Sequence, residues 1–280
     1  MPWYFVIIIF LSSCFLLSLL SSQLIKSLSR IGKFLGWREF VIAFFVMAFA
    51  ASLPNLFVGL NAVLHGIPEV ALGDIIGGNL VDLTFVLAIA AFFSKKGLSA
   101  NSSTVQKTAF FTAGIAVLPL FLIWDGRLDR LDGIILLFAF AFYVWWLFAE
   151  KRRFHKEYNH ANGKDKITFN EFLLDLAKII LTVLVLVALS QAVIWSAQFF
   201  SATFHISLSL VGILIIGLGN AFPETYFSII SARKNENWLV LGDLMGSVIV
   251  CATLVLGIIA IVSPFEIKDL SLFITARTFL

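Results

Sequence analysis

The sequence predicts an all-α polytopic membrane protein with two inverted-topology repeats of transmembrane helices and proline-interrupted helices at the bilayer centre. The chain has 280 residues, of which 60% are hydrophobic and 13% charged, whereas about 25% of the residues in a soluble domain are charged. Pro54 and Pro223 each follow a run of small residues inside an apolar segment. These two segments also align with each other.

Apolar runs long enough to cross a bilayer can be drawn at 2–25, 39–63, 70–93, 108–124, 133–149, 172–199, 207–232 and 238–262. No basic segment precedes the first run, so we expect a retained helix rather than a cleaved signal peptide. Cys14 and Cys251 fall inside spans, and we expect them to be small packing residues. The run from Leu270 to Leu280 is too short to cross, so we expect the C-terminal helices to be incomplete.

Positive charge alternates between loops. The loops at 26–38, 94–107, 150–171 and 233–237 hold 4, 3, 6 and 2 Lys or Arg residues, and the loops between them hold 0, 2, 0 and 1. Short cytoplasmic loops carry the excess of positive charge. The pattern predicts a multi-pass protein of the cell (plasma) membrane with its N-terminus outside and a basic cytoplasmic linker at 150–171. The lipid bilayer is its expected surroundings, and neither nucleic acid nor an obligate protein partner is predicted.

An internal repeat relates the two halves of the chain. A constant shift that lays Pro54 on Pro223 aligns the halves without a gap from about residue 41 to 91. The same register pairs Gly73 with Gly242, Asp74 with Asp243, Gly77 with Gly246 and Thr84 with Thr253. The proline spans are the second and the seventh, so the copies should run in opposite directions. This predicts a first membrane repeat at 1–149, of about five helices with its motif at 41–91, and a second at 172–280 with its motif at 210–260.

Polar side chains of four spans converge on one depth, near the middle of the membrane. A carboxylate at that depth is costly and usually marks an ion path; the structural alternative is a neutral acid beside a proline kink. The candidate ion ligands are Ser52, Asn55, Asp82, Asn220, Glu224 and Ser247. Their hard oxygens, together with carbonyls freed by the prolines, suit Ca²⁺ or Na⁺.

Asp74 and Asp243 occupy matching positions about two helical turns from the centres of their spans. We expect them to form acidic vestibules that concentrate cations, Asp74 on the external side and Asp243 on the cytoplasmic side. Capping of a helix start is the alternative, because Asp is favoured there.

Four segments of the chain resemble the two α-repeats of the cation/Ca²⁺ antiporter superfamily, specifically the sodium/calcium exchanger membrane-region family. They are AASLPNLFVGL, GDIIGGNLVDLTFVLAIA, GNAFPETYFSI and GDLMGSVIVCATLVLG. The resemblance covers nearly the whole chain and implies ten helices in two five-helix repeats, of which this divergent chain lacks about the last two. It also implies a secondary active antiporter that exchanges Ca²⁺ against Na⁺ by alternating access. No enzymatic chemistry or cofactor is implied, since the two ions are the transported ligands.

Several positions depart from the pattern of that family. The family's first-repeat Glu is Asn55 here, and the acid on its partner helix is Cys251. Asp82 stands where the family has Asn. Two central carboxylates remain, Asp82 and Glu224, which together balance one Ca²⁺.

Three other functions stay open. A proton-coupled Ca²⁺ or cation exchanger would use H⁺ as the coupling ion, carried by Glu224 or Asp82 after removal from water. A non-transporting relative would keep the fold with a degraded ion site. An intramembrane aspartyl protease would need a Gly-x-Gly-Asp motif, but Gly219 is followed by Asn220.

Overall fold

Two sets of helices, one from each half of the chain, form a single bundle in the computed structural model, which describes residues 2–34, 49, 51–94, 97–98, 103–149, 169–233 and 237–267. The first half contains α1 (Trp3–Phe34), α3 (Leu53–Leu64), α4 (Pro68–Val81), η2 (Asp82–Val86), α5 (Leu87–Phe93), α6 (Ser103–Leu122), η3 (Ile123–Asp125), β1 (Arg127–Leu128) and α7 (Arg130–Ala149). The second contains α8 (Phe169–Phe204), α9 (Leu208–Leu210), η5 (Val211–Ile216), α10 (Gly217–Asn220), α11 (Phe222–Arg233), α12 (Asn237–Ile249), η6 (Val250–Val255), α13 (Leu256–Val262) and β2 (Phe265–Glu266). Here η2, η5 and η6 are π-helical and η3 is a 3-10 turn.

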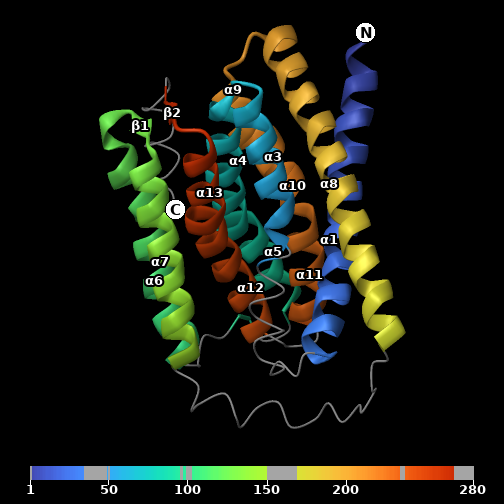
Figure 1. Cartoon of the computed structure of the whole chain (residues 1–280), viewed down its shortest axis with the longest axis vertical. Helices are drawn as coiled ribbons and strands as arrows, with labels where there is room; N and C mark the ends of the chain where they lie inside the picture. The colour runs from blue at the N-terminus through green and yellow to red at the C-terminus, as the bar shows by residue number, and fades with distance from the viewer. Residues whose placement is uncertain are drawn as a thin grey trace.

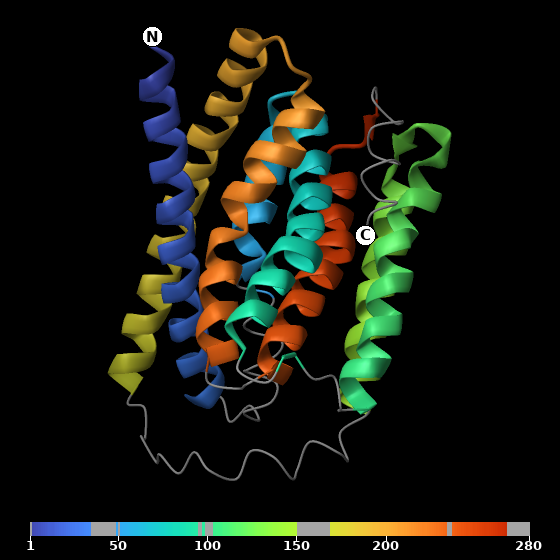
Figure 2. The same cartoon turned by 180° about the vertical axis from the view of Figure 1, so that it is seen from behind.

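The helices are arranged in three groups. Helices α1 and α8 lie along one side of the bundle, and α6 and α7 lie along the other (Figure 1). The helices that carry the candidate ligands fill the middle, as the reverse view also shows (Figure 2). The predicted all-α membrane fold is confirmed, and the middle of the bundle is where both halves of the chain meet.

The helix bounds of the two halves keep the predicted offset between Pro54 and Pro223. Under that shift, the bounds of α3 fall on Phe222 and Arg233, which are the bounds of α11. The bounds of α5 fall on Leu256 and Val262, which are the bounds of α13. In Figure 1, α4 leads into α5 away from the end that holds α9, and α12 leads into α13 toward it. The two copies therefore have opposite directions, and the predicted inverted topology is confirmed.

Both copies contain a π-helical segment at the same place, a feature that was not predicted from the sequence. η2 ends at Val86 and η6 ends at Val255, which are counterparts under the same shift. Single π-helical turns inside α-helices occur frequently at functional sites. Here η2 follows directly on α4 and begins at Asp82, and η6 follows directly on α12, which contains Ser247.

Glycines bring the backbones of α4 and η5 into contact. A Cβ atom added to Gly77 would overlap the carbonyl oxygen of Ile213, and one added to Gly73 would lie 2.8 Å from that of Ser209. On the other side, a Cβ on Gly217 would meet the backbone of Gly77 at 2.7 Å. Small residues permit this close approach between membrane helices. This glycine seam fixes the first repeat against the second beside the candidate ligands.

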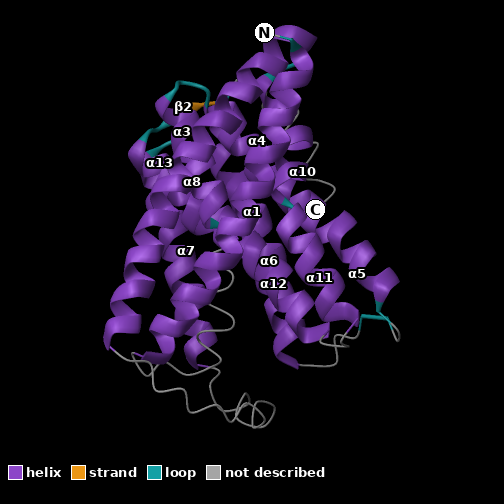
Figure 3. Ribbon diagram, turned by 90° about the vertical axis from the view of Figure 1, so that its right-hand side faces the viewer, coloured by secondary structure: helices purple, strands orange, loops and turns teal. Residues whose placement is uncertain are grey.

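Helices α1 and α8 pack along each other (Figure 3). Two ion pairs also join them at one end. Arg30 Nε lies 3.1 Å from Asp175 Oδ2, and Arg30 Nη2 lies 3.9 Å from Glu171 Oε1. The rings of Phe10 and Phe200 meet edge to face with centroids 5.7 Å apart. The predicted first span ended at residue 25, whereas α1 continues to Phe34 and thus carries Arg30 to its partners on α8.

The described helices suit a membrane. Three are long and apolar enough to cross one, namely Pro68–Phe93, Glu171–Phe204 and Val240–Val262, and the pair Leu208–Asn220 and Glu224–Arg233 qualifies as one span bent by 41°. Each of the eight predicted spans contains a described helix. The eight-span count itself stays a prediction. Of the linker predicted at 150–171, residues 150–168 lie outside the described residues, as does the run from Leu270 to Leu280, whereas 169–171 begin α8.

A short two-stranded antiparallel sheet accompanies the helices and was not predicted from the sequence. β1 pairs with β2, with Arg127 opposite Glu266 and Leu128 opposite Phe265. Gly126, whose φ of 83° lies in the left-handed region, turns the chain before β1, and its carbonyl accepts a bond from the Ile267 N–H. Strands of two residues carry no readable alternation of apolar and polar positions, so this sheet could not be predicted.

The glycine seam leads to a test of stability. Gly77→Ala should destabilise the protein, because its methyl group collides with backbone that cannot move aside, at a cost of about 1–3 kcal/mol. Gly78→Ala is the matched control, since a Cβ at that position meets no atom within 4 Å. Thermal unfolding of both purified variants measures the difference. Equal unfolding temperatures for the two variants would show that the seam is looser than described.

Candidate cation site

The candidate ligands lie at matching breaks in two helices. Ser52 is the residue before α3, and Asn55 is the third residue of that helix. Asn220 ends α10, and Glu224 is the third residue of α11. Proline occupies the second position of both new helices, where its missing N–H does no harm. In each copy, the break therefore places a polar side chain in the first turn of a buried helix.

Polar contacts join the two repeats across the middle of the bundle. Asn220 Nδ2 donates to Asp74 Oδ1 at 2.8 Å, and Asn55 Nδ2 donates to Cys251 Sγ at 3.2 Å. The Ser247 hydroxyl donates to the Asp82 carboxylate. Each of these pairs has one member in each repeat. The six predicted ligands are all buried at the boundary between the repeats.

The two amide contacts were not predicted from the sequence. Asp74 was expected to lie apart from Asn220, and Cys251 was expected to be only a packing residue. Cys251 is buried, as expected, but it also accepts from Asn55 and from the Ser52 hydroxyl. A usable signal was present, because all of these residues lie in the repeat motifs, at the faces that carry the other candidate ligands.

Four carboxylates share the electrostatic environment of the site. Asp74, Asp82 and Asp243 are each near enough to Glu224 to disfavour a negative charge on it. Asp74 and Asp243 also disfavour a negative charge on Asp82. Among the described residues, no ion pair joins any of these four carboxylates to a Lys, Arg or His side chain. The ion pairs of the described residues involve Arg30, Arg127 and Lys178 instead. In their ionised forms the four acids repel one another, and no described protein cation offsets that charge.

Three carboxylate oxygens of the site have no hydrogen-bond partner among the residues that the structure describes. They are Asp74 Oδ2, Asp82 Oδ1 and Glu224 Oε2, each with essentially no solvent-accessible surface. Burying a charge without a partner is strongly unfavourable, so such oxygens are normally paired, protonated or bound to a cation. These oxygens are available as ligands.

Open space lies next to the acids. Gly78 is buried, yet a Cβ placed on it meets no atom within 4 Å, apart from its own helix backbone and chain neighbours. Asp74, Gly78 and Asp82 are spaced by four along α4 and the start of η2, so they share one face. The space beside Gly78 therefore lies between the two aspartates.

A cation here would take few carboxylates at once. Within the described residues, no group of three or more His, Cys, Asp or Glu side chains is close enough to hold one metal ion. The site fits a cation that two acids share with neutral oxygens from Ser, Asn and the backbone, as Ca²⁺ and Na⁺ accept. Pro223 has no N–H, so it cannot donate to the Gly219 carbonyl.

Asp74 and Asp243, which the sequence analysis placed in vestibules or at helix starts, have different surroundings in the structure. Asp74 is the seventh residue of α4 and Asp243 the seventh of α12, so neither caps a helix start, and the capping alternative is wrong. The exposed fraction of Asp74 is 0%, and it bonds Asn220. Asp74 therefore belongs to the closed interior in this conformation rather than to an open vestibule. Asp243 is partly exposed, and its vestibule role stays a prediction.

A second polar cluster ties α3 to α8. Asn61 Nδ2 donates to Ser190 Oγ, and Gln191 Nε2 donates to Asn61 Oδ1 at 2.6 Å. This cluster was not predicted. The residue that aligns with Asn61 in the second repeat is Ile230, so the internal alignment did not mark the position as polar in both copies.

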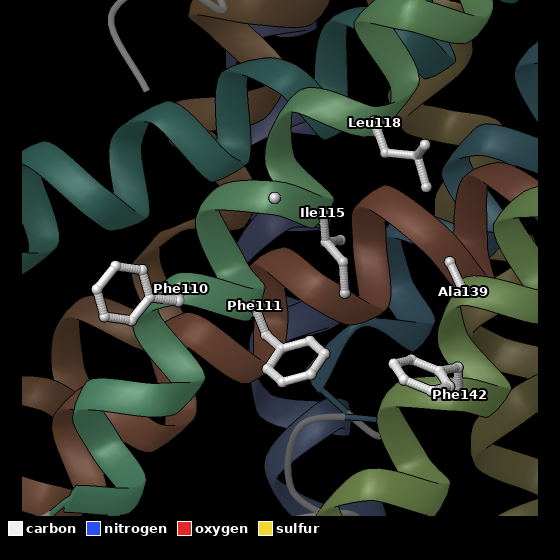
Figure 4. A pocket seen from close by; sticks show the side chains of 7 residues that line it. Phe110, Phe111, Ile115, Leu118, Ala139 and Phe142 are labelled. Carbon is white, nitrogen blue, oxygen red and sulfur yellow. The ribbon is translucent and has the colours of Figure 1, made fainter.

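A hollow between α6 and α7 is a different kind of feature. It has a volume of about 390 Å³ and is lined by Phe110, Phe111, Gly114, Ile115, Leu118, Ala139 and Phe142 (Figure 4). Its lining has no ionisable side chain, so no side chain there can neutralise a cation.

Comparisons with known proteins agree with this geometry. The family model described as sodium/calcium exchanger protein matches residues 5–149 and 175–280. The chain is 26% identical to the inner membrane protein YrbG of Escherichia coli, over 90% of this chain and 78% of that protein. It is 22% identical to the sodium/calcium exchanger MaX1 of Methanosarcina acetivorans, over 91% of this chain and 82% of that protein.

A solved structure has the same fold. The sodium-calcium exchanger NCX_Mj superimposes with a TM-score of 0.63, covering 99% of this chain and 90% of that one at 21% identity. At this identity the likeness establishes the fold, and function has to be argued from the site.

The contact between Asn55 and Cys251 generates a test of the site. The double variant Asn55→Glu with Cys251→Asp places two carboxylates in contact, so it should be less stable than the wild type without cations, by about 1 kcal/mol or more. Calcium should recover that stability by sitting between them. Thermal unfolding with and without CaCl₂ measures both effects, and each single variant is a control. A calcium response identical to that of the wild type would show that these side chains face away from the ion.

Proposed function

Because the chain belongs to the sodium/calcium exchanger protein family, we propose that it is a secondary active antiporter that moves Ca²⁺ against Na⁺ across a membrane. The observation that carries the proposal is the buried pair Asp82 and Glu224, each with an unpartnered oxygen, at the boundary between two inverted repeats. Two carboxylates balance one divalent cation. The other ligands are Ser52, Asn55, Asn220 and Ser247 together with backbone carbonyls.

Exchange requires that the site opens to one side of the membrane at a time. The α1 and α8 pair is suited to move as one unit, because Arg30, Asp175 and Glu171 join the two helices by charge. The inverted repeats support two related conformations, one open to each side. Contacts such as that between Asn61 and Ser190 must change when α8 moves relative to α3.

The second candidate is proton coupling. The unpartnered oxygens of Asp82 and Glu224 favour it too, because H⁺ neutralises a buried carboxylate without a basic partner, as a metal ion does. Isotopic calcium uptake into vesicles, under sodium and proton gradients imposed separately, distinguishes the two. Uptake driven by sodium alone supports sodium coupling, and uptake driven only by the proton gradient contradicts it.

The orientation in the membrane is part of the proposal. The protein is an integral membrane protein, and its charge distribution supports an N-terminus outside, a cytoplasmic linker at 150–171 and a location in the cell membrane. In that orientation Asp74 lies on the external side of the central pair and Asp243 on the cytoplasmic side. No covalent chemistry is required, since the ion gradient supplies the driving force.

The central pair generates a test of transport. Glu224→Gln and Asp82→Asn each remove one charge that neutralises the cation while keeping the shape of the side chain. Calcium uptake by either variant in sodium-loaded vesicles should fall to below about a tenth of the wild-type rate. Glu266→Gln, at an exposed acid in β2, is the control and should transport normally. Wild-type rates in both central variants would contradict the site, and an inactive wild type would contradict the function.

A further inference from the structure

We propose that Asn61, Ser190 and Gln191 form a hydrogen-bonded latch that holds the external gate of the transporter closed. We call these three residues the external latch. The inference rests on the proposed transport function and adds to it a control over which gate opens. None of the three residues is a candidate ligand of the cation site.

The side-chain amide of Asn61 is bonded to α8 through both of its ends. Its Nδ2 donates to Ser190 Oγ and, at 3.4 Å, to the carbonyl oxygen of Val187, and its Oδ1 accepts from Gln191 Nε2 at 2.6 Å. Asn61 and Ser190 are both buried. Since an amide offers donors on nitrogen and an acceptor on oxygen, these contacts use both kinds of group. The latch therefore fastens α3 to α8.

The latch lies between the cation site and one end of the bundle. Asn61 follows Asn55 by six residues, or about 9 Å along α3, in the direction of the helix end at Leu64. That helix end points toward α9 and the end of the bundle where the N-terminus lies (Figure 1). In the proposed orientation this is the external side. The closed latch thus holds α8 against α3 on the external side of the buried ligands.

Breaking the latch has a cost that belongs to the membrane. The central ligands are buried in this conformation, so helices must part before a cation reaches them from outside. When α8 leaves α3, Asn61 and Gln191 lose each other as partners. Gln191 lies on the exposed side of α8, where lipid supplies no replacement for a lost hydrogen bond. The latch therefore favours the closed external gate.

The second repeat cannot form the same latch. The residue that corresponds to Asn61 is Ile230, and those that correspond to Ser190 and Gln191 are Ser21 and Ser22. The side chain of Ile has neither a donor nor an acceptor. Opening toward the cytoplasm therefore does not break an equivalent set of bonds, and the latch biases the two gates differently.

Cys251 can report the opening of either gate, because it is buried and bonded to Asn55 in the central site. The chain has two cysteines, Cys14 and Cys251, so all variants are made in a Cys14→Ser background. A membrane-impermeant methanethiosulfonate is added to right-side-out or inside-out vesicles that contain the full chain. Mass spectrometry of the intact protein gives the rate at which Cys251 is modified from each side.

Asn61→Ile copies the second repeat and removes the bonds between α3 and α8. It should raise the rate of modification from the external side by about three- to tenfold, as expected when two hydrogen bonds between membrane helices are lost. The rate from the cytoplasmic side should not rise. Gln191→Leu, which removes one of the bonds, should have a smaller effect in the same direction.

Ser196→Ala is the matched control on the same helix. The hydroxyl of Ser196 donates to the Ala192 carbonyl within α8, rather than to α3. Its loss should leave the rates of modification from both sides as in the Cys14→Ser background.

Other results overturn the latch. An external rate for Asn61→Ile equal to that of the background shows that these bonds do not hold the gate. Equal rises from both sides show a general loosening of the bundle. A rise from the cytoplasmic side alone overturns the assignment to the external gate. If Asn61→Ile does not fold, Gln191→Leu takes its place, and an unchanged external rate then overturns the proposal.

The two proposals fail in different ways. A wild type that exchanges calcium, with Asn61→Ile modified from outside no faster than the background, removes only the latch. A wild type that moves no calcium, and whose Cys251 is modified from neither side, removes the transport function and the latch together.

Discussion

Buried acidic side chains without a basic partner among the described residues are the constraint on which the rest of the structure depends. Asp74, Asp82 and Glu224 each present an oxygen that no donor of the described residues reaches, and the groups that act on their electrostatics are further acids rather than bases. Such a core is costly unless something positive enters it. The broken helices and the open space beside Gly78 make sense as the means by which a cation enters and leaves.

Position along the chain was enough to predict the repeats, but not the contacts between them. Pro54, Pro223 and the paired glycines are local signals, and the constant offset that they indicate reappears in the helix bounds. The bonds from Asn220 to Asp74 and from Asn55 to Cys251 join residues 146 and 196 positions apart. Which faces meet over such separations depends on how whole helices pack. The depth of Asp74 could be counted from sequence, whereas its burial could not.

The two repeats have the same backbone and different chemistry. Asn55 faces Cys251 as a neutral pair, while Asn220 faces Asp74 as an amide with an acid. Asn61 bonds Ser190 in α8, but its counterpart is Ile230. An inverted repeat with identical side chains would respond equally to both sides of the membrane. These differences make the two halves of the bundle chemically distinct, although their backbones are related by the repeat.

The proposal of a divalent cation bound by Asp82 and Glu224 rests on the buried acids and the broken helices together. Diffraction from crystals grown with Sr²⁺ in place of Ca²⁺ tests it most directly, because the heavier ion is located by its anomalous signal. We predict a peak within about 2.3–2.7 Å of one oxygen of each of these carboxylates, close to the distances for Ca²⁺. A structure at saturating Sr²⁺ with no peak between them, or with a peak held only by exposed acids, would contradict this.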